Sequence, residues 1–202
     1  MPLKLLKRNH FYRCLPLLVL PAAWWAATHL NSNWAHSPGD VVDSYNDVAI
    51  HYNGAIAHDD GRNLAPDGYN LGLRWQCVEF VKRYYYQRLG HRMPEPRGNA
   101  KEFFDEGLAD GAMNLARGLL QFRNEGRALP QVDDIVVFGG WLGNPYGHVA
   151  IVSRVEPGGI EIVQQNPGPF GASREWIAIG MVNGEPRLAA SRLLGWLRLP
   201  RP

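Results

Sequence analysis

The stretch RWQCVEFVKRYYY, residues 74–86, decides how we expect this chain to fold. From Val78 onward its apolar residues recur at close to helical spacing, and Gly90 ends the predicted helix. The segment before it, residues 67–72, is typical of a turn. Cys77 is therefore expected in the first turn of the helix. There the unpaired amides and the helix dipole favour a negative charge, so a thiolate is stabilised.

A cysteine in this position has two interpretations. It can be a nucleophile, or it can be a small buried apolar residue, which is the more common fate of an isolated cysteine. The chain has one other cysteine, Cys14, and two cysteines make neither a disulfide framework nor a zinc site. We therefore expect no metal and no cofactor.

The composition indicates a globular, β-containing domain. The 202 residues suffice for one domain with a core and an N-terminal tail, and 46% hydrophobic with 20% charged residues favours a globular fold. The net charge of only +2, without a basic stripe interleaved with aromatics, predicts no nucleic-acid partner. The 15 prolines and 22 glycines favour a loop-rich, β-containing domain over a helical bundle. The oligomeric state is left open.

The first 30 residues have the pattern of an export segment. Four Lys and Arg residues precede position 14, and residues 14–28 are the most apolar stretch of the chain. This run is short for a full membrane span, which needs about 20 residues. We predict a signal anchor or signal peptide at residues 1–30, with the domain on the periplasmic or outer side of a bacterial inner membrane, or secreted. The alternative is an amphipathic helix packed on the domain.

The remainder predicts an α+β fold. Residues 31–46 are polar and contain Pro38 and Gly39, so we interpret them as a linker and place the domain at residues 47–202. Residues 47–52 alternate in part and predict a first strand. Further strands are expected at residues 134–138, 148–155, 160–165, 174–179 and 193–199. A helix followed by such strands predicts a nucleophile-bearing helix packed on an antiparallel sheet.

A cysteine nucleophile needs a base beside it and a third group that orients the base. Among seven histidines, His148 stands out because it opens a predicted strand directly after a glycine. The next strand returns beside it, so Gln164 and Asn166 are expected near His148, on one face because side chains alternate along a strand. Ordinary hydrogen bonding at a strand end is the other interpretation of these two residues.

Three segments together resemble a known family: WQCVEF at 75–80, GHVAI at 147–151 and QQN at 164–166. They are similar to the CHAP domain, the cysteine/histidine-dependent amidohydrolase/peptidase group within the papain-like NlpC/P60 superfamily. The most similar branch is the amidase domain of glutathionylspermidine synthetase/amidase enzymes. The resemblance covers roughly residues 47–166 and implies a papain-like CHAP fold.

The resemblance also implies a mechanism. Cys77 would attack an amide carbonyl, and His148 would pair with the thiolate and then protonate the leaving amine. The third residue falls on Gln164, where the branch tends to carry glutamate, with Asn166 as possible support. A glutamine oxygen can still accept the proton of His148 Nδ1, but it cannot stabilise the imidazolium by charge. Replacing Gln164 by glutamate is therefore expected to preserve or raise activity.

The developing oxyanion would need hydrogen-bond donors near Cys77. The backbone N–H of Cys77 is the first candidate, and Gln76 or Arg74 is the candidate for the second, although Gln76 can equally cap the helix. Trp141 and Tyr146 lie on the loop before His148. They are candidates for lining a substrate groove, or for covering the edge of the core.

Three functions fit these observations. The first is a cysteine amidase or peptidase that is held at the membrane and cleaves an amide bond in cell-wall peptidoglycan peptides. The second is an amidase for glutathionylspermidine or a similar small γ-glutamyl or polyamine conjugate, which would be met inside the cell. The third is a catalytically weak binding module on a CHAP scaffold, in which Cys77 behaves as an ordinary thiol with a pKa of about 8.5.

Overall fold

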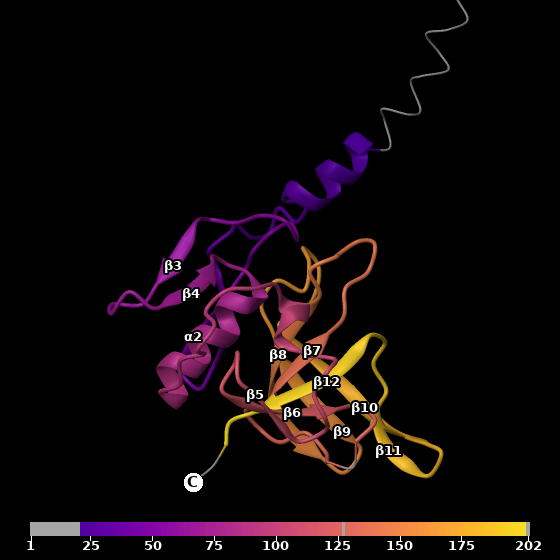
Figure 1. The fold of residues 1–202 in the computed structure, drawn as a ribbon. Helices are drawn as coiled ribbons and strands as arrows, with labels where there is room; N and C mark the ends of the chain where they lie inside the picture. Colours follow the sequence, from indigo (N-terminus) through magenta and orange to yellow (C-terminus); the bar gives the residue numbers. More distant parts are fainter. Residues whose placement is uncertain (1–20, 127, 201–202) are drawn as a thin grey trace, which may run out of the picture.

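A computed structural model describes residues 21–126 and 128–200 (Figure 1). Its main element is an eight-stranded antiparallel sheet in the order β11-β10-β9-β8-β7-β12-β6-β5. The strands are β5 (Ala112–Asn114), β6 (Leu119–Arg123), β7 (Ile135–Phe138), β8 (His148–Glu156), β9 (Gly159–Val163), β10 (Arg174–Val182), β11 (Glu185–Leu188) and β12 (Leu193–Arg198).

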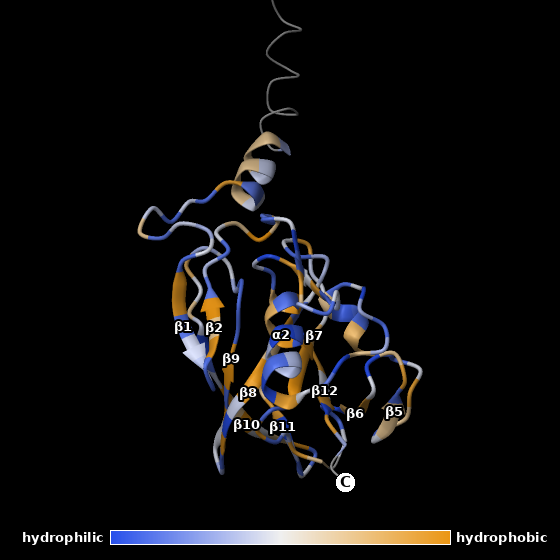
Figure 2. Ribbon diagram, turned by 90° about the vertical axis from the view of Figure 1, so that its left-hand side faces the viewer, coloured by the Kyte–Doolittle hydropathy of each residue, from blue (hydrophilic) through white to orange (hydrophobic). Residues whose placement is uncertain are grey.

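The helix α2 (Cys77–Leu89) packs on this sheet at β8. Figure 2 shows α2 in front of β7 and β8, whose ribbons have the colour of hydrophobic residues. The buried face of the helix is apolar and aromatic, and it meets the inward-facing residues of β7 and β8. The shared core includes Phe80, Val81, Tyr84, Tyr85, Ile135, Val137, Val149 and Ile151. Each such side chain stabilises the fold by about 1.5–3 kcal/mol when buried. The predicted α+β arrangement is confirmed.

Two small hairpins and a short 3-10 helix complete the described fold. One hairpin pairs β1 (Val41–Tyr45) with β2 (Val48–His51), and the other pairs β3 (Arg62–Leu64) with β4 (Asn70–Leu73). The 3-10 helix is η1 (Ala100–Phe103). The α2 helix also packs against β2 and β4, so both hairpins lie beside the helix that carries Cys77.

All six predicted strands are present, as β2, β7, β8, β9, β10 and β12. The strands β1, β3, β4, β5, β6 and β11 were not predicted. They have only three to five residues each. Segments this short show too few alternations to be recognised from the sequence, and pairing with neighbouring strands decides their conformation.

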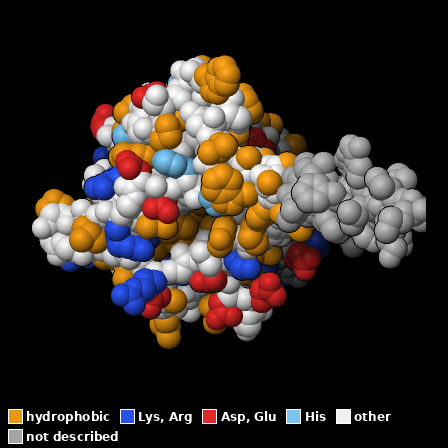
Figure 3. Space-filling model, turned by 90° about the horizontal axis from the view of Figure 1, so that it is seen from above, with side chains coloured by type: hydrophobic (Ala, Val, Ile, Leu, Met, Phe, Trp, Pro, Cys, Tyr) orange, Lys and Arg blue, Asp and Glu red, His pale blue; other side chains and the backbone are white. Residues whose placement is uncertain are grey.

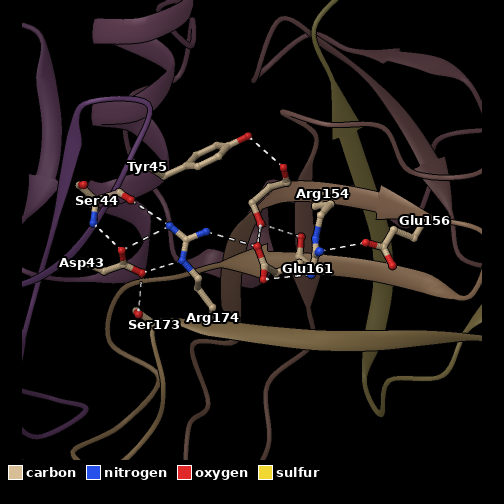
Figure 4. A network of polar contacts seen from close by, with 9 residues as sticks. Asp43, Ser44, Tyr45, Arg154, Glu156, Glu161, Ser173 and Arg174 are labelled. Atoms are coloured by element: carbon tan, nitrogen blue, oxygen red, sulfur yellow. Dashed lines mark hydrogen bonds and ion pairs between the residues drawn. The ribbon is translucent and has the colours of Figure 1, made fainter.

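Residues 31–46, interpreted as a linker, include the strand β1 and are attached to the domain. Asp43 accepts a hydrogen bond from Arg174 Nε at 2.8 Å and one from Ser173 Oγ at 2.8 Å. Figure 4 shows Arg174 between Asp43 and Glu161, with Glu161 Oε1 3.3 Å from Arg174 Nη1. The partners of Asp43 are about 130 residues away in the chain, so no local pattern could have revealed this attachment.

The N-terminal segment is described only in part. Residues 21–29 form a helix that projects from the domain in Figure 1, and its end is attached because Ala57 N donates to Thr28 O at 2.9 Å. Within residues 21–126 and 128–200, no helix is both long and apolar enough to cross a membrane. Most of the expected signal anchor, with Cys14, falls on residues 1–20 and lies outside the described residues. The anchor and the exported location stay predictions.

A buried carboxylate joins α2 to the strands around it. Glu79 is fully buried and accepts hydrogen bonds from Arg83 Nε at 2.6 Å, Asn63 Nδ2 at 2.8 Å and Gln165 Nε2 at 2.8 Å. Gln165 in turn accepts from the backbone N–H of His51 in β2 at 2.8 Å. The start of α2 is thereby held against β2, β3 and the residues that follow β9.

We expect Glu79→Ala to lower the free energy of unfolding by about 3 kcal/mol or more, because it leaves the Arg83 guanidinium buried without its carboxylate. Urea unfolding at pH 7 measures the change. Arg154→Ala is the matched control, because Arg154 pairs with Glu156 at the exposed surface and its loss should change stability by less than about 1 kcal/mol. Equal losses of unfolding free energy in the two variants would contradict the conclusion that the buried Glu79–Arg83 pair stabilises the fold.

Candidate active site

Cys77 lies where the sequence predicted it, at the first residue of α2. Its side chain is largely buried but lines a cleft of about 520 Å³, and His148 lines the same cleft. The amides in the first turn of a helix have no partner within the helix. Figure 3 looks onto the end of the domain from which the N-terminal helix projects, where basic, acidic and histidine side chains lie among apolar ones.

His148 is the first residue of β8 and follows Gly147, as predicted. Gly147 has φ +79°, and a Cβ there would meet the backbone oxygen of Phe138, so only glycine fits this approach. The His148 ring bonds through Nε2 to Gln164 Oε1 at 2.8 Å. The predicted contact between His148 and Gln164 is present, but it uses Nε2 and not the expected Nδ1.

The orientation of the Gln164 amide decides which nitrogen of His148 carries the proton. Gln164 Nε2 donates to the carbonyl oxygen of Ala172 at 3.1 Å. The hydrogen-bond network therefore directs the amide oxygen toward His148, and an oxygen can only accept. The proton of the neutral ring lies on Nε2, and Nδ1 keeps the lone pair that a general base needs.

Two further amides brace the loops beside Cys77. Gln76 Nε2 donates to the carbonyl oxygens of Ile56, at 3.2 Å, and His58. Asn166 Nδ2 donates to Gln76 Oε1 at 2.8 Å and to Ile56 O at 3.1 Å. Gln76 makes no side-chain cap to α2, and its donors already have acceptors. This geometry favours a positioning role for Gln76 and Asn166, and it leaves the backbone N–H of Cys77 as the donor for an oxyanion.

The remaining candidates fall on two sides of His148. Tyr146 lines the Cys77 cleft, and Trp141 lines a second hollow of about 610 Å³. Both hollows include His148 and Asn166 in their walls, so the two hollows adjoin at these residues. Arg74 lines neither hollow, and its backbone pairs with Gly61 and Asp60.

Some of the lining was not recognised in the sequence. Arg62 in β3, Arg97 and His29 all line the Cys77 cleft. His29 was assigned to the tail, but it stacks on Trp25 with ring centroids 5.0 Å apart at the attached end of the N-terminal helix. No motif surrounds these residues, because only folding brings the three separate segments that carry them to one cleft.

Burial shifts the protonation of both members of the pair. It raises the pKa of the Cys77 thiol to about 11, although hydrogen bonds from the backbone N–H groups of Val149 and Val78 act in the opposite direction. Burial lowers the pKa of His148 to about 4; the hydrogen bond to Gln164 opposes this change, and the charge of Arg192 adds to it. Both pKa shifts favour the uncharged forms, a neutral thiol and a neutral imidazole, near pH 7.

The comparison with known families decides the class of domain. The model of the CHAP domain family matches residues 67–166, which include Cys77, His148, Gln164 and Asn166. The chain contains a CHAP domain. The predicted CHAP resemblance and the predicted α+β fold are confirmed, and the family match supports a hydrolase that acts on amide bonds.

Curated relatives agree with the branch to which the sequence was compared. Glutathionylspermidine synthase of Crithidia fasciculata is 33% identical over 144 residues, which cover 65% of this chain and 20% of that protein. Trypanothione synthetase of the same organism is 27% identical over 95 residues, covering 47% of this chain and 15% of that protein. The chain thus spans a fifth or less of the length of these relatives.

Solved structures include Ly7917 with the hydrolyzing product of MDP. This CHAP-containing chain matches it with a TM-score of 0.40 and 20% sequence identity, over 68% of this chain and 56% of that one. A second structure of Ly7917 gives a TM-score of 0.35 at 22% identity, covering 62% and 53%.

The lowered pKa of His148 predicts an acid-sensitive domain. The unfolded chain takes up a proton near pH 6.5 and the folded one only near pH 4, so the unfolded state binds more protons between these values and stability falls as the pH is lowered through them. The contribution of His148 is at most about 3 kcal/mol. Urea unfolding at pH 7 and pH 4.5 should show a smaller acid-induced loss for His148→Gln than for the unchanged protein, and an equal loss would contradict the buried neutral ring.

Proposed function

We propose that this chain is a cysteine-dependent amidohydrolase or peptidase that cleaves an amide bond in peptides of cell-wall peptidoglycan. The observation that carries the proposal is the orientation of His148. Its Nε2 is held by Gln164 at 2.8 Å, which leaves Nδ1 as the nitrogen with a lone pair, and His148 lines the same cleft as Cys77 at the start of α2. A nucleophile, a base and a group that orients the base are the parts that thiol catalysis needs.

The neutral resting pair suggests how the reaction would begin. The proton of Cys77 Sγ passes to His148 Nδ1 as the sulfur attacks the substrate carbonyl carbon and forms the S–C bond. The negative oxygen of the tetrahedral intermediate faces the backbone N–H at the start of α2. The C–N bond then breaks, and Nδ1 gives its proton to the leaving amine. Water, deprotonated by Nδ1, hydrolyses the thioester and restores the thiol.

The charges of the cleft favour a substrate with a free carboxylate. The charged groups Asp59, Arg62 and Arg97 line the hollow around Cys77. Arg62 donates to Asn70 Oδ1 at 3.0 Å, and among the described residues neither arginine forms an ion pair. Two guanidiniums against one carboxylate suit an acidic peptide, because arginine binds carboxylates in bidentate geometry. Peptidoglycan stem peptides have this chemistry, but meeting them depends on the predicted export.

The second candidate function is hydrolysis of glutathionylspermidine or a similar γ-glutamyl or polyamine conjugate. The similarity to glutathionylspermidine synthase favours it. The excess of arginine near Cys77 disfavours it, because a polyamine is a cation. A catalytically weak binding module is the third candidate, and it differs from both enzymes in having no use for an oriented His148.

The test of the proposed function uses the full chain with Cys14→Ser, so that Cys77 is the one remaining thiol. We expect this protein to release new amino groups from peptidoglycan fragments, measured by mass spectrometry of the products, and to act more slowly on glutathionylspermidine. Cys77→Ser and His148→Ala should each lower the rate by at least about a thousandfold, because each removes half of the nucleophile–base pair. Their circular dichroism should be unchanged.

An active Cys77→Ala protein would contradict the mechanism. Hydrolysis of glutathionylspermidine alone would make the second function the correct one. If neither substrate is cleaved and the alkylation of Cys77 by iodoacetamide is unchanged in His148→Ala, the binding module is the better description.

The charge argument makes a separate prediction. Arg62→Gln with Arg97→Gln should raise the KM for an acidic stem peptide about tenfold and leave kcat within about twofold, since both charges lie beside the reacting groups without taking part in the chemistry. Arg88→Gln is the matched control, because Arg88 is exposed in the last turn of α2, at the end opposite Cys77. An unchanged KM would show that the carboxylate is bound elsewhere or is not required.

A further inference from the structure

Gln164 has an acidic neighbour on the side away from His148. Its Nε2 lies 3.3 Å from Glu175 Oε2, and it also donates to the carbonyl oxygen of Ala172 at 3.1 Å. Both neighbours of the NH2 group are acceptors. Gln164 itself is buried, whereas Glu175 is exposed at the wall of the second hollow, which His148 also lines.

The register of the sheet brings Glu175 to this position. Glu175 in β10 pairs with Ile162 in β9, and side chains two apart on a strand share a face, so Gln164 is the diagonal neighbour of Glu175. The backbone N–H of Gln164 continues this pairing by donating to Ser173 O at 2.8 Å. Arg174, between Ser173 and Glu175, points to the opposite face, where Figure 4 shows it with Asp43 and Glu161.

We propose that Glu175 is a positioning residue for the reaction: through its contact with the Gln164 amide it selects the tautomer of His148 that can act as the base. The proposal rests on the proposed function. Gln164 provides no carboxylate to His148. In this proposal Glu175 supplies one, and it acts on His148 through the Gln164 amide.

The reasoning follows from the two ends of a primary amide. An NH2 group next to a carboxylate donates to it, so the amide oxygen must point the other way, toward His148 Nε2. Nε2 then carries the proton, and Nδ1 is free to accept the proton of Cys77. If the amide turned over, its NH2 group would face Nε2. The ring proton would move to Nδ1, and His148 could no longer act as the base.

Glu175→Gln is the informative variant, because glutamine keeps the size of the side chain but can present either an oxygen or an NH2 group to Gln164. The Ala172 carbonyl then remains as the only fixed acceptor described for the Gln164 NH2 group, so the preferred orientation of the amide is weakened. We expect kcat to fall about fivefold with KM unchanged, because a charged acceptor holds an amide more strongly than a neutral one. Glu185→Gln is the matched control, since Glu185 is an exposed carboxylate in β11 and its loss changes the net charge equally.

Glu175→Gln should raise kcat, and not lower it, when Gln164 is replaced by glutamate. In Gln164→Glu the two carboxylates would be neighbours and would repel each other. The structure thus changes the expectation that this replacement by itself preserves or raises activity. Adding Glu175→Gln removes the repulsion and supplies an NH2 donor to the new carboxylate, so kcat of the double variant should exceed that of Gln164→Glu about fivefold. A residue with a merely structural role would lower activity in both backgrounds.

The experiment combines two measurements on the full chain with Cys14→Ser. Nitrogen-15 NMR of the His148 ring, identified by its absence in His148→Ala, reports the tautomer without any substrate. We expect the proton on Nε2 in this parent protein and in Glu185→Gln, and a mixture with the Nδ1 form in Glu175→Gln. The kinetic measurement determines the change in kcat that Glu175→Gln causes in the parent protein and in the Gln164→Glu variant.

The outcomes separate this inference from the proposed function. A tautomer that does not respond to Glu175→Gln, or a fall in kcat in both backgrounds, would overturn the role of Glu175 even if the enzyme is active. If the parent protein cleaves no amide, the proposed function fails, and the NMR measurement still decides whether Glu175 sets the tautomer of His148.

Discussion

The candidate site depends on one buried interaction, the contact between the Glu79 carboxylate and the side chain of Gln165. A buried carboxylate is costly unless it is paired and hydrogen-bonded, and Glu79 takes its partners from α2, β3 and the end of β9. The position of the helix is therefore tied to the position of Gln165. Since neighbouring residues of a strand face opposite ways, the same backbone directs Gln165 to the helix and Gln164 to His148. One short segment thus places His148 relative to Cys77.

Burial shifts the pKa values of both Cys77 and His148. It opposes the ionised state that a helix terminus favours, and it makes the resting thiol and imidazole neutral. For the proposed reaction, the direction of the imidazole is then more important than its charge, because the ring would have to offer a lone pair to Cys77 from the start. Three amides, those of Gln76, Gln164 and Asn166, therefore form the polar frame of the site.

A frame built from amides has a weakness that a carboxylate frame does not have. A carboxylate presents the same oxygen atoms whichever way it turns, whereas a glutamine amide presents a donor in one orientation and an acceptor in the other. Each amide in this site is oriented by acceptors on its NH2 side. For Gln76 these are backbone carbonyl groups, for Asn166 a carbonyl group and Gln76 itself. For Gln164 they are a carbonyl group and Glu175. The charges of Arg62 and Arg97 in the Cys77 cleft are separate from this frame and belong to the proposal about the substrate.

The α+β fold, the position of Cys77 at a helix start and the pairing of His148 with Gln164 could all be predicted from the sequence. These features depend on local patterns: helical and alternating periodicity, a glycine before a strand, and two strands joined by a tight turn. The tertiary structure decided the rest, including the attachment of residues 31–46, the lining by Arg62 and Arg97, the use of His148 Nε2 and the neutral state of the pair. These depend on burial and on contacts between residues far apart in the chain, such as Asp43 with Arg174, and no periodicity encodes a contact of that kind.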